Sequence, residues 1–167
     1  MQKEVTKSWA LFIGIGIIMI AHGLQMQLMG IRSVVENFSV VTTGIFMSGY
    51  FTGYFLGSKT TPLLVQKVGH IRVFAAFASL ASLSALLAAV YVNPTMWTLS
   101  RFITGISLVS CYIVTESWLN DRATNKNRGQ LLSAYFIILY IGLGIGMLLL
   151  NVSDPKNYEP FILVSVL

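Results

Sequence analysis

The sequence has 167 residues, of which 55% are hydrophobic and only 10% are charged. An ordinary soluble domain carries about 25% charged residues, so this composition excludes a water-soluble enzyme. The net charge is +5, but the basic residues are spread along the chain and form no single patch or arm. We therefore expect no nucleic-acid partner.

Long uncharged intervals separate the charged residues. A helix needs about 20 apolar residues to cross the hydrocarbon core of a bilayer. We therefore predict an all-α polytopic membrane protein with five full spans and the start of a sixth. The spans are predicted at about residues 9–30, 40–57, 73–92, 96–118 and 130–150, and the sixth begins at about residue 161.

The distribution of lysine and arginine among the short loops predicts the orientation, because cytoplasmic loops are enriched in these residues. Eight basic residues lie in the N-terminal segment and in the loops after the second and fourth spans, whereas Arg32 and Lys156 lie on the opposite side. We expect an integral protein of a bacterial cytoplasmic (inner) membrane, with its N-terminus in the cytoplasm.

A weak internal repeat favours one architecture. The Ser-Gly-Tyr-Phe sequence at residues 48–51 is followed 85 residues later by Ser-Ala-Tyr-Phe at residues 133–136, and Trp9 and Trp97 are 88 residues apart. Three spans per repeat would invert the second copy relative to the first, as in many secondary transporters. A few matches in apolar sequence also arise by chance, so both interpretations stay open here.

Two predicted spans carry glycines at intervals of four residues. Such a stripe lets a neighbouring backbone approach closely, either for static packing or for helices that slide and tilt. The predicted packing glycines are Gly49, Gly53 and Gly57 in the second span, and Gly142 and Gly146 in the fifth.

Polar side chains deep in two spans are candidates for a substrate cavity. His22 lies about 3 Å from the middle of the first span at 1.5 Å per residue, and Gln25 shares its face. A buried polar group faces a cavity or a partner, so His22 binds substrate or a proton, or else hydrogen-bonds to a neighbouring helix. In the fourth span, Arg101 and Thr104 line the cavity, or else Arg101 snorkels to the interface.

The sequence carries no recognisable catalytic or cofactor constellation. Cys111 is the single cysteine and lies inside a predicted span, so we expect no disulfide and no metal site. No Ser/His/Asp set, intramembrane carboxylate pair or phosphate-binding glycine loop is present. We therefore expect neither a cofactor nor enzymatic activity.

Five short motifs are spread along the chain. They are Ser-Gly-Tyr-Phe-Thr-Gly at 48–53, Lys-Val-Gly-His-x-Arg at 67–72, Arg-Phe-x-x-Gly at 101–105, Glu-Ser at 116–117 and Asn-Arg-Gly-Gln-Leu-Leu-Ser-Ala-Tyr at 127–135. Together they resemble the N-terminal half of the major facilitator superfamily, most closely its YcaD-like branch. The resemblance implies twelve helices in two six-helix halves, with alternating access to a central cavity. This chain would then be the N-terminal half, without the C-terminal half.

The sequence departs from the family pattern at several positions. In the loop between the second and third helices, Pro62 stands for a glycine, Gln66 for an aspartate and His70 for a basic residue. Thr104 replaces the glutamine of the helix-four motif. The glycines of the fifth span are not followed by proline, which argues against a drug–proton antiporter.

The resemblance also implies a cytoplasmic gating network. Its candidate members are Lys67, Gly69, Arg72, Glu116 and Arg128. For Glu116, an ordinary interfacial carboxylate is the alternative. Tyr135 is a further cavity candidate, although the sequence does not separate cavity-lining from lipid-facing tyrosines.

Two functions remain in competition. The first is a secondary transporter that moves a small solute, with coupling to a proton or ion left open, by rocking one six-helix half against the other. The alternative is a non-transporting membrane protein, such as a truncated paralogue that acts as an assembly partner.

Overall fold

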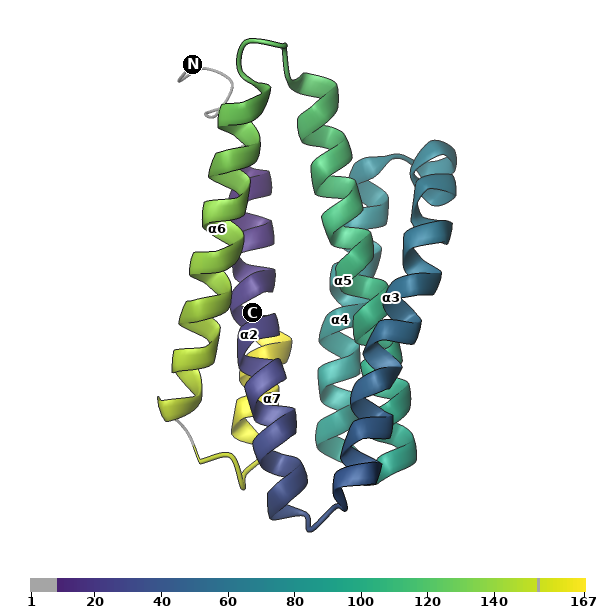
Figure 1. Cartoon of the computed structure of the whole chain (residues 1–167), viewed down its shortest axis with the longest axis vertical. Coiled ribbons are helices and arrows are strands. Elements are labelled where there is room, and N and C mark those ends of the chain that lie inside the picture. Colours follow the sequence, from purple (N-terminus) through teal and green to yellow (C-terminus); the bar gives the residue numbers. More distant parts are fainter. Residues whose placement is uncertain (1–8, 153) are drawn as a thin grey trace.

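The computed structural model describes residues 9–152 and 154–167, which form six α-helices and one short 3-10 helix. The helices run along the long axis of the molecule in alternating directions (Figure 1). The all-helical prediction is confirmed, while Lys3 and Lys7 of the predicted cytoplasmic terminus lie outside the described residues. The elements are α2 (Trp9–Val35), α3 (Val40–Val68), α4 (His70–Val90), α5 (Pro94–Arg122), α6 (Arg128–Leu149), η1 (Leu150–Val152) and α7 (Glu159–Val166).

The helices extend beyond the apolar stretches that predicted them. α2 continues past residue 30 because Arg32, in its last turn, forms an ion pair of 2.6 Å with Glu36. α3 continues past residue 57, through Pro62, and ends before Gly69, whose φ of 86° lies in the left-handed region that glycine adopts without strain. Hydropathy locates the apolar part of a helix, whereas pairing and capping of polar residues determine its ends.

Four stretches are long and apolar enough to cross a membrane, among the residues that the structure describes. α3 is not one of them, although it coincides with the second predicted span. It has 29 residues, but its threonines, glycines, serines and tyrosines lower its apolarity. The four stretches are Trp9–Val35, His70–Val90, Pro94–Arg122 and Arg128–Val152.

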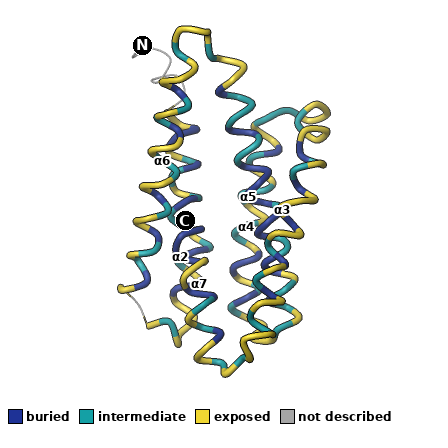
Figure 2. The backbone as a smooth tube through the Cα atoms, viewed as in Figure 1, coloured by how far each residue is buried: buried dark blue, intermediate teal, exposed yellow. Residues whose placement is uncertain are grey.

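The bundle is built from two helix pairs. α3 packs along α5, and α2 packs along α6; α4 covers α5, and α7 contacts both α4 and α2. In Figure 1 the α2–α6 pair and the α3–α4–α5 group stand side by side, and α7 lies next to α2. Buried residues follow the sides of the helices that face one another, while the outward sides are largely exposed (Figure 2).

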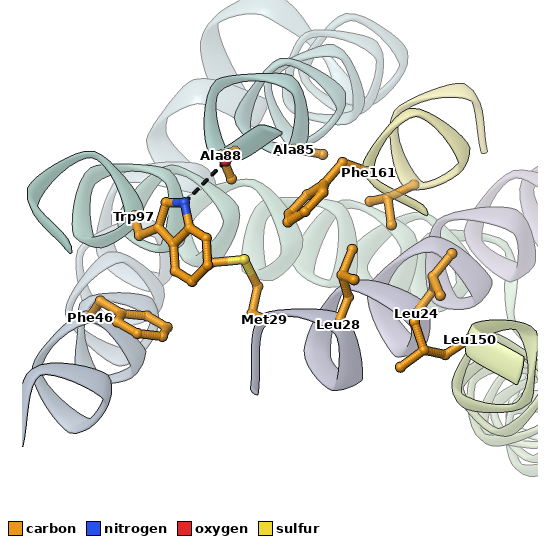
Figure 3. Close-up of a cluster of buried hydrophobic side chains, with 10 residues drawn as sticks. Leu24, Leu28, Met29, Phe46, Ala85, Ala88, Trp97, Leu150 and Phe161 are labelled. Atoms are coloured by element: carbon orange, nitrogen blue, oxygen red, sulfur yellow. Dashed lines mark hydrogen bonds between the residues drawn. The ribbon is translucent and has the colours of Figure 1, made fainter. Parts of the chain in front are cut away.

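Two apolar clusters lie toward opposite ends of the bundle. The first surrounds Trp97, whose indole nitrogen donates a hydrogen bond of 3.0 Å to the carbonyl oxygen of Ala88 (Figure 3). Phe46 packs edge-on against the indole, with ring centroids 5.3 Å apart. The second cluster joins Leu11, Phe12, Ile15, Cys111, Leu119, Leu131 and Tyr135.

Candidate functional site

Buried polar side chains occupy the middle of the bundle, between the two apolar clusters. His22 and Gln25 come from α2, and Arg101 and Thr104 come from α5. None of the four is more than 8% exposed. Polar groups at the centre of an apolar helical bundle are costly and mark binding sites or transport pathways, so this layer is the candidate site.

Arg101 lies over the aromatic ring of Tyr50 from α3, with 4.9 Å between the guanidinium carbon and the ring centroid. The Arg101 side chain is 3% exposed, so it stays inside the bundle instead of extending to the surface. Its Nε and Nη1 atoms are buried and have no hydrogen-bond partner among the residues that the structure describes. A cation–π contact contributes about 0.5–2 kcal/mol, whereas burying an ion costs several kcal/mol. Tyr50 alone therefore leaves the charge of Arg101 uncompensated.

His22 stacks on the same tyrosine. The rings of His22 and Tyr50 are nearly parallel, with an interplanar angle of 13° and a centroid distance of 5.7 Å. The Nδ1 atom of His22 is buried and has no hydrogen-bond partner within the described part of the chain. Tyr50 thus brings together two buried side chains that both retain unused hydrogen-bonding capacity.

A cavity of about 530 Å³ adjoins these three side chains. Its volume falls within the range of sites for small molecules. His22, Tyr50, Arg101 and Gln27 form the polar part of its wall. The other lining residues are Met26, Met47, Phe51 and Met147.

A second cavity, of about 330 Å³, lies between α2, α4, α5 and α7. His22, Gln25 and Thr104 line it. Gln25 Nε2 donates to Thr104 Oγ1 over 3.4 Å, and the hydroxyl groups of Thr104 and Ser84 are 2.8 Å apart. His22 therefore lines both cavities, and Gln25 and Thr104 link α2 to α5.

Tyr135 does not share this location. It is fully buried in the second apolar cluster and lines neither cavity. Its hydroxyl donates a hydrogen bond of 3.1 Å to Glu116 Oε1. The structure thus joins a predicted cavity residue to a predicted gating residue, and Tyr50, whose location the sequence left open, lines the cavity.

The other gating candidates do not meet in the described part of the chain. No ion pair there joins Glu116 to Lys67, Arg72 or Arg128. Gly69 and Arg72 lie at the α3–α4 turn and share a small cavity there with Trp118 of α5. The polar contact between this turn and α5 is made by His70.

His70 was noted in the sequence only as a departure from the family pattern. Its Nε2 atom lies 3.0 Å from the hydroxyl of Ser117 and 3.7 Å from Asp121 Oδ2. Its ring also packs near Trp118, with centroids 6.3 Å apart. His70 thus links the start of α4 to the end of α5. The sequence could have indicated this role, because the family usually has a basic residue at this position.

The glycines of α3 lie where this helix crosses α5. A methyl group on Gly53 would collide with the carbonyl oxygen of Phe102. Gly49 and Gly57 approach α5 one turn to either side. Gly105 of α5 approaches α3 equally closely, because a methyl group there would collide with the Tyr50 carbonyl oxygen.

The same arrangement recurs where α6 crosses α2. A methyl group on Gly146 would collide with the carbonyl oxygen of Ile20, and one on Gly142 would contact α2 one turn away. Gly23 of α2 approaches the carbonyl oxygen of Leu143 in return. Gly23 was not among the predicted packing residues, since it has no second small residue in a four-residue stripe.

No metal-binding cluster of three or more His, Cys, Asp or Glu side chains occurs within residues 9–152 and 154–167. Cys111 is buried and free.

A family model described as Major Facilitator Superfamily matches residues 11–152. The chain belongs to this superfamily. Its members are membrane transporters and not enzymes. This agrees with the expected membrane protein and with the expectation that the chain has no enzymatic activity.

The relatives named YcaD agree with the predicted branch. The chain is 32% identical over 118 residues to the "Uncharacterized MFS-type transporter YcaD" of Escherichia coli O45:K1, a match covering 70% of this chain and 30% of the relative. An uncharacterized MFS-type transporter of Enterobacter sp. strain 638 is 30% identical over 134 residues, or 79% of this chain and 35% of the relative. The chain thus spans about a third of the length of these relatives. No solved structure gave a significant match.

Proposed function

We propose that the chain forms the N-terminal half of a secondary transporter, which carries a small solute by alternating access. The observation that carries this proposal is the buried, unpartnered pair of His22 and Arg101 beside one cavity in an otherwise apolar bundle. A protein that served only as a scaffold would gain nothing from a buried charge without a counter-charge. The opposing half of the cavity would come from a C-terminal half that faces this one.

The two glycine crossings support an inverted three-helix repeat. Gly105 follows Gly23 by 82 residues and Gly146 follows Gly53 by 93 residues, and each glycine contacts the backbone of the opposite helix at its own crossing. The α2–α6 pair then corresponds to the α5–α3 pair. This register differs from the spacings of 85 and 88 residues expected from the sequence. The different environments of exposed Trp9 and fully buried Trp97 agree with a shifted register.

Under this proposal the second membrane span is α3, despite its lower apolarity. Its glycines pack against α5, and its Tyr50 and Phe51 side chains line the larger cavity. A span with one face on a polar cavity needs less hydrophobicity than one that faces lipid on most sides.

Alternating access predicts that a cavity-lining position is reachable from either side of the membrane. The test places a single cysteine at Met147, which lines the larger cavity, in the intact protein with its other cysteines replaced. A membrane-impermeant maleimide is then applied to right-side-out and to inside-out vesicles. We expect labelling from both sides.

Leu148 provides the matched control. It is the next residue of α6, is 68% exposed and lines neither cavity, so it would face lipid. A cysteine there should stay unlabelled from both sides. If the cysteine at Met147 reacts from one side only or from neither, the protein does not alternate, and the assembly-partner function is favoured.

A further inference from the structure

The larger cavity contains a positive charge that nothing in its wall neutralises. Arg101 keeps its proton at any physiological pH, because an arginine guanidinium is effectively always charged. Two of its three nitrogen atoms, Nε and Nη1, are buried without a hydrogen-bond partner among the described residues. The guanidinium group is planar, and pairs of its N–H donors match the two oxygens of a carboxylate.

No acidic side chain of the described residues lines this cavity. Glu116 is the nearest acid along α5 and lies fifteen residues from Arg101, about 22 Å at 1.5 Å per residue. Glu36 is already in an ion pair with Arg32. The cavity of this half therefore has a cationic pole with no anionic one.

Apart from Gln27, the rest of the wall is apolar and polarisable. Three methionines and a phenylalanine line the cavity, and Tyr50 contributes an aromatic ring. Methionine side chains adapt to ligands of varied shape and make favourable contacts with aromatic rings. A ligand that fills this space therefore has an apolar body, preferably an aromatic one. The methionines are Met26, Met47 and Met147.

We propose that this cavity binds a small organic monoanion with an aromatic body, whose acid group pairs with Arg101 and whose ring packs beside Tyr50 and the methionines. The proposal rests on the transport function proposed above and names its substrate class. The unpartnered Nδ1 atom of His22 supplies a further hydrogen bond to the ligand, because His22 lies against the same tyrosine ring. Charge provides the selectivity in this site, and the apolar body provides affinity.

The test measures binding to the intact, detergent-purified protein by titration calorimetry. The probes share one body and differ in charge: benzoate, phenylacetate and 3-phenylpropionate are anions, benzamide is neutral and benzylamine is a cation. Acetate tests the need for the aromatic body. We expect at least one aromatic acid to bind about tenfold or more tightly than benzamide, benzylamine and acetate.

Variants then locate the binding. Arg101→Leu should abolish the preference for the aromatic acid over benzamide, and Arg101→Lys should retain part of it, because lysine keeps the charge without the planar fork. Lys126→Leu is the matched control: it removes one basic charge from the exposed α5–α6 loop and should leave the preference intact. Thermal unfolding without ligand confirms that each variant is folded. If Arg101→Leu does not fold, Arg101→Lys alone tests the role of the guanidinium group.

Three results would overturn the inference. The first is that none of the three aromatic acids binds up to about 10 mM. The second is that benzylamine or benzamide binds as tightly as the aromatic acids, or more tightly. The third is that the preference for the acid is unchanged in Arg101→Leu or Arg101→Lys. Uptake into proteoliposomes separates this inference from the proposed function. Binding of an aromatic acid without uptake contradicts transport and supports the site, whereas uptake of benzylamine but of no acid supports transport and contradicts the substrate class.

Discussion

Gly53 of α3 and Gly105 of α5 interlock where the two helices cross: each lies so close to the opposite helix that a side chain would collide with its backbone. In a membrane, where lipid is as apolar as leucine, such close approach is a main source of helix association. The crossing holds Tyr50 beside Arg101, because the carbonyl group of Tyr50 is the one that Gly105 contacts.

Gly53→Ala should therefore destabilise the protein by about 1–3 kcal/mol, since the added methyl group forces the helices apart. Gly44→Ala is the control on the same helix, because nothing lies within 4 Å of a Cβ there. It should be neutral or slightly stabilising, as alanine is the better helix former by about 1 kcal/mol. Thermal unfolding of the intact protein in detergent measures both changes, and equal effects would contradict the close contact.

The α2–α6 crossing offers a matched pair on one helix. Gly146→Ala introduces a methyl group against the Ile20 carbonyl group, whereas Gly144 has open space around it. We expect a loss of about 1–3 kcal/mol for Gly146→Ala and none for Gly144→Ala. Because the two crossings have the same close geometry, Gly146→Ala and Gly53→Ala should cost similar amounts in the same unfolding assay.

The orientation is tested by labelling introduced cysteines in intact cells. The α3–α4 and α5–α6 connections lie at one end of the bundle, and the α6–α7 connection lies at the other (Figure 1). Cysteines at Gln66 and Asn125, which are exposed at the first end, should stay unlabelled by an impermeant reagent until the membrane is permeabilised. A cysteine at exposed Asn157, at the other end, should react at once. The reverse pattern would invert the topology.

The sequence was sufficient for the helical class because charge-free intervals are set by the cost of placing charges in hydrocarbon. It was also sufficient to single out His22 and Arg101, since polar groups stand out against an apolar background. The ends of α2 and α3 were not predictable in this way. They depend on the pairing of Arg32 with Glu36 and on the backbone of Gly69, neither of which changes the hydropathy pattern.

Tyrosine locations were beyond the reach of the sequence for a different reason. Tyr50 and Tyr135 occur in nearly identical local sequences, yet Tyr50 lies in the cavity wall and Tyr135 binds Glu116 in an apolar cluster. A tyrosine is compatible with water, lipid and protein interior alike. Only the packing of the helix around each tyrosine decides between these environments, and the local sequence does not contain that information.

The hydrogen bonds of Thr104 predict a loss of stability on removal of its hydroxyl group. Thr104 bonds to Gln25 of α2 and Ser84 of α4 as well as to its own helix. Thr104→Val should cost about 0.5–2 kcal/mol, in the range of interhelical hydrogen bonds in membranes. Thr115→Val is the control, because the hydroxyl of buried Thr115 bonds, among the described residues, only to the Cys111 carbonyl group one turn earlier. This change should be nearly neutral. Equal losses in thermal unfolding would show that Thr104 does not link the helices.

Tyr50 is predicted to stabilise the buried charge of Arg101 through its ring. Among the described residues its hydroxyl group has no hydrogen-bond partner, so Tyr50→Phe should change the stability little. Tyr50→Leu removes the cation–π contact and should cost about 1–3 kcal/mol, whereas Tyr140→Leu, at a tyrosine that is 71% exposed, should cost less than about 0.5 kcal/mol.

The double variant isolates the interaction itself. With Arg101 already replaced by leucine, Tyr50→Leu has no cation–π contact to remove, so its cost should fall by about 0.5–2 kcal/mol relative to its cost in the parent protein. Unfolding free energies of the parent, the two single variants and the double variant give this difference directly. If Tyr50→Leu costs the same in both backgrounds, the ring stabilises the helices only by packing. Arg101 would then be buried without compensation from Tyr50, and its need for an anionic ligand would be greater still.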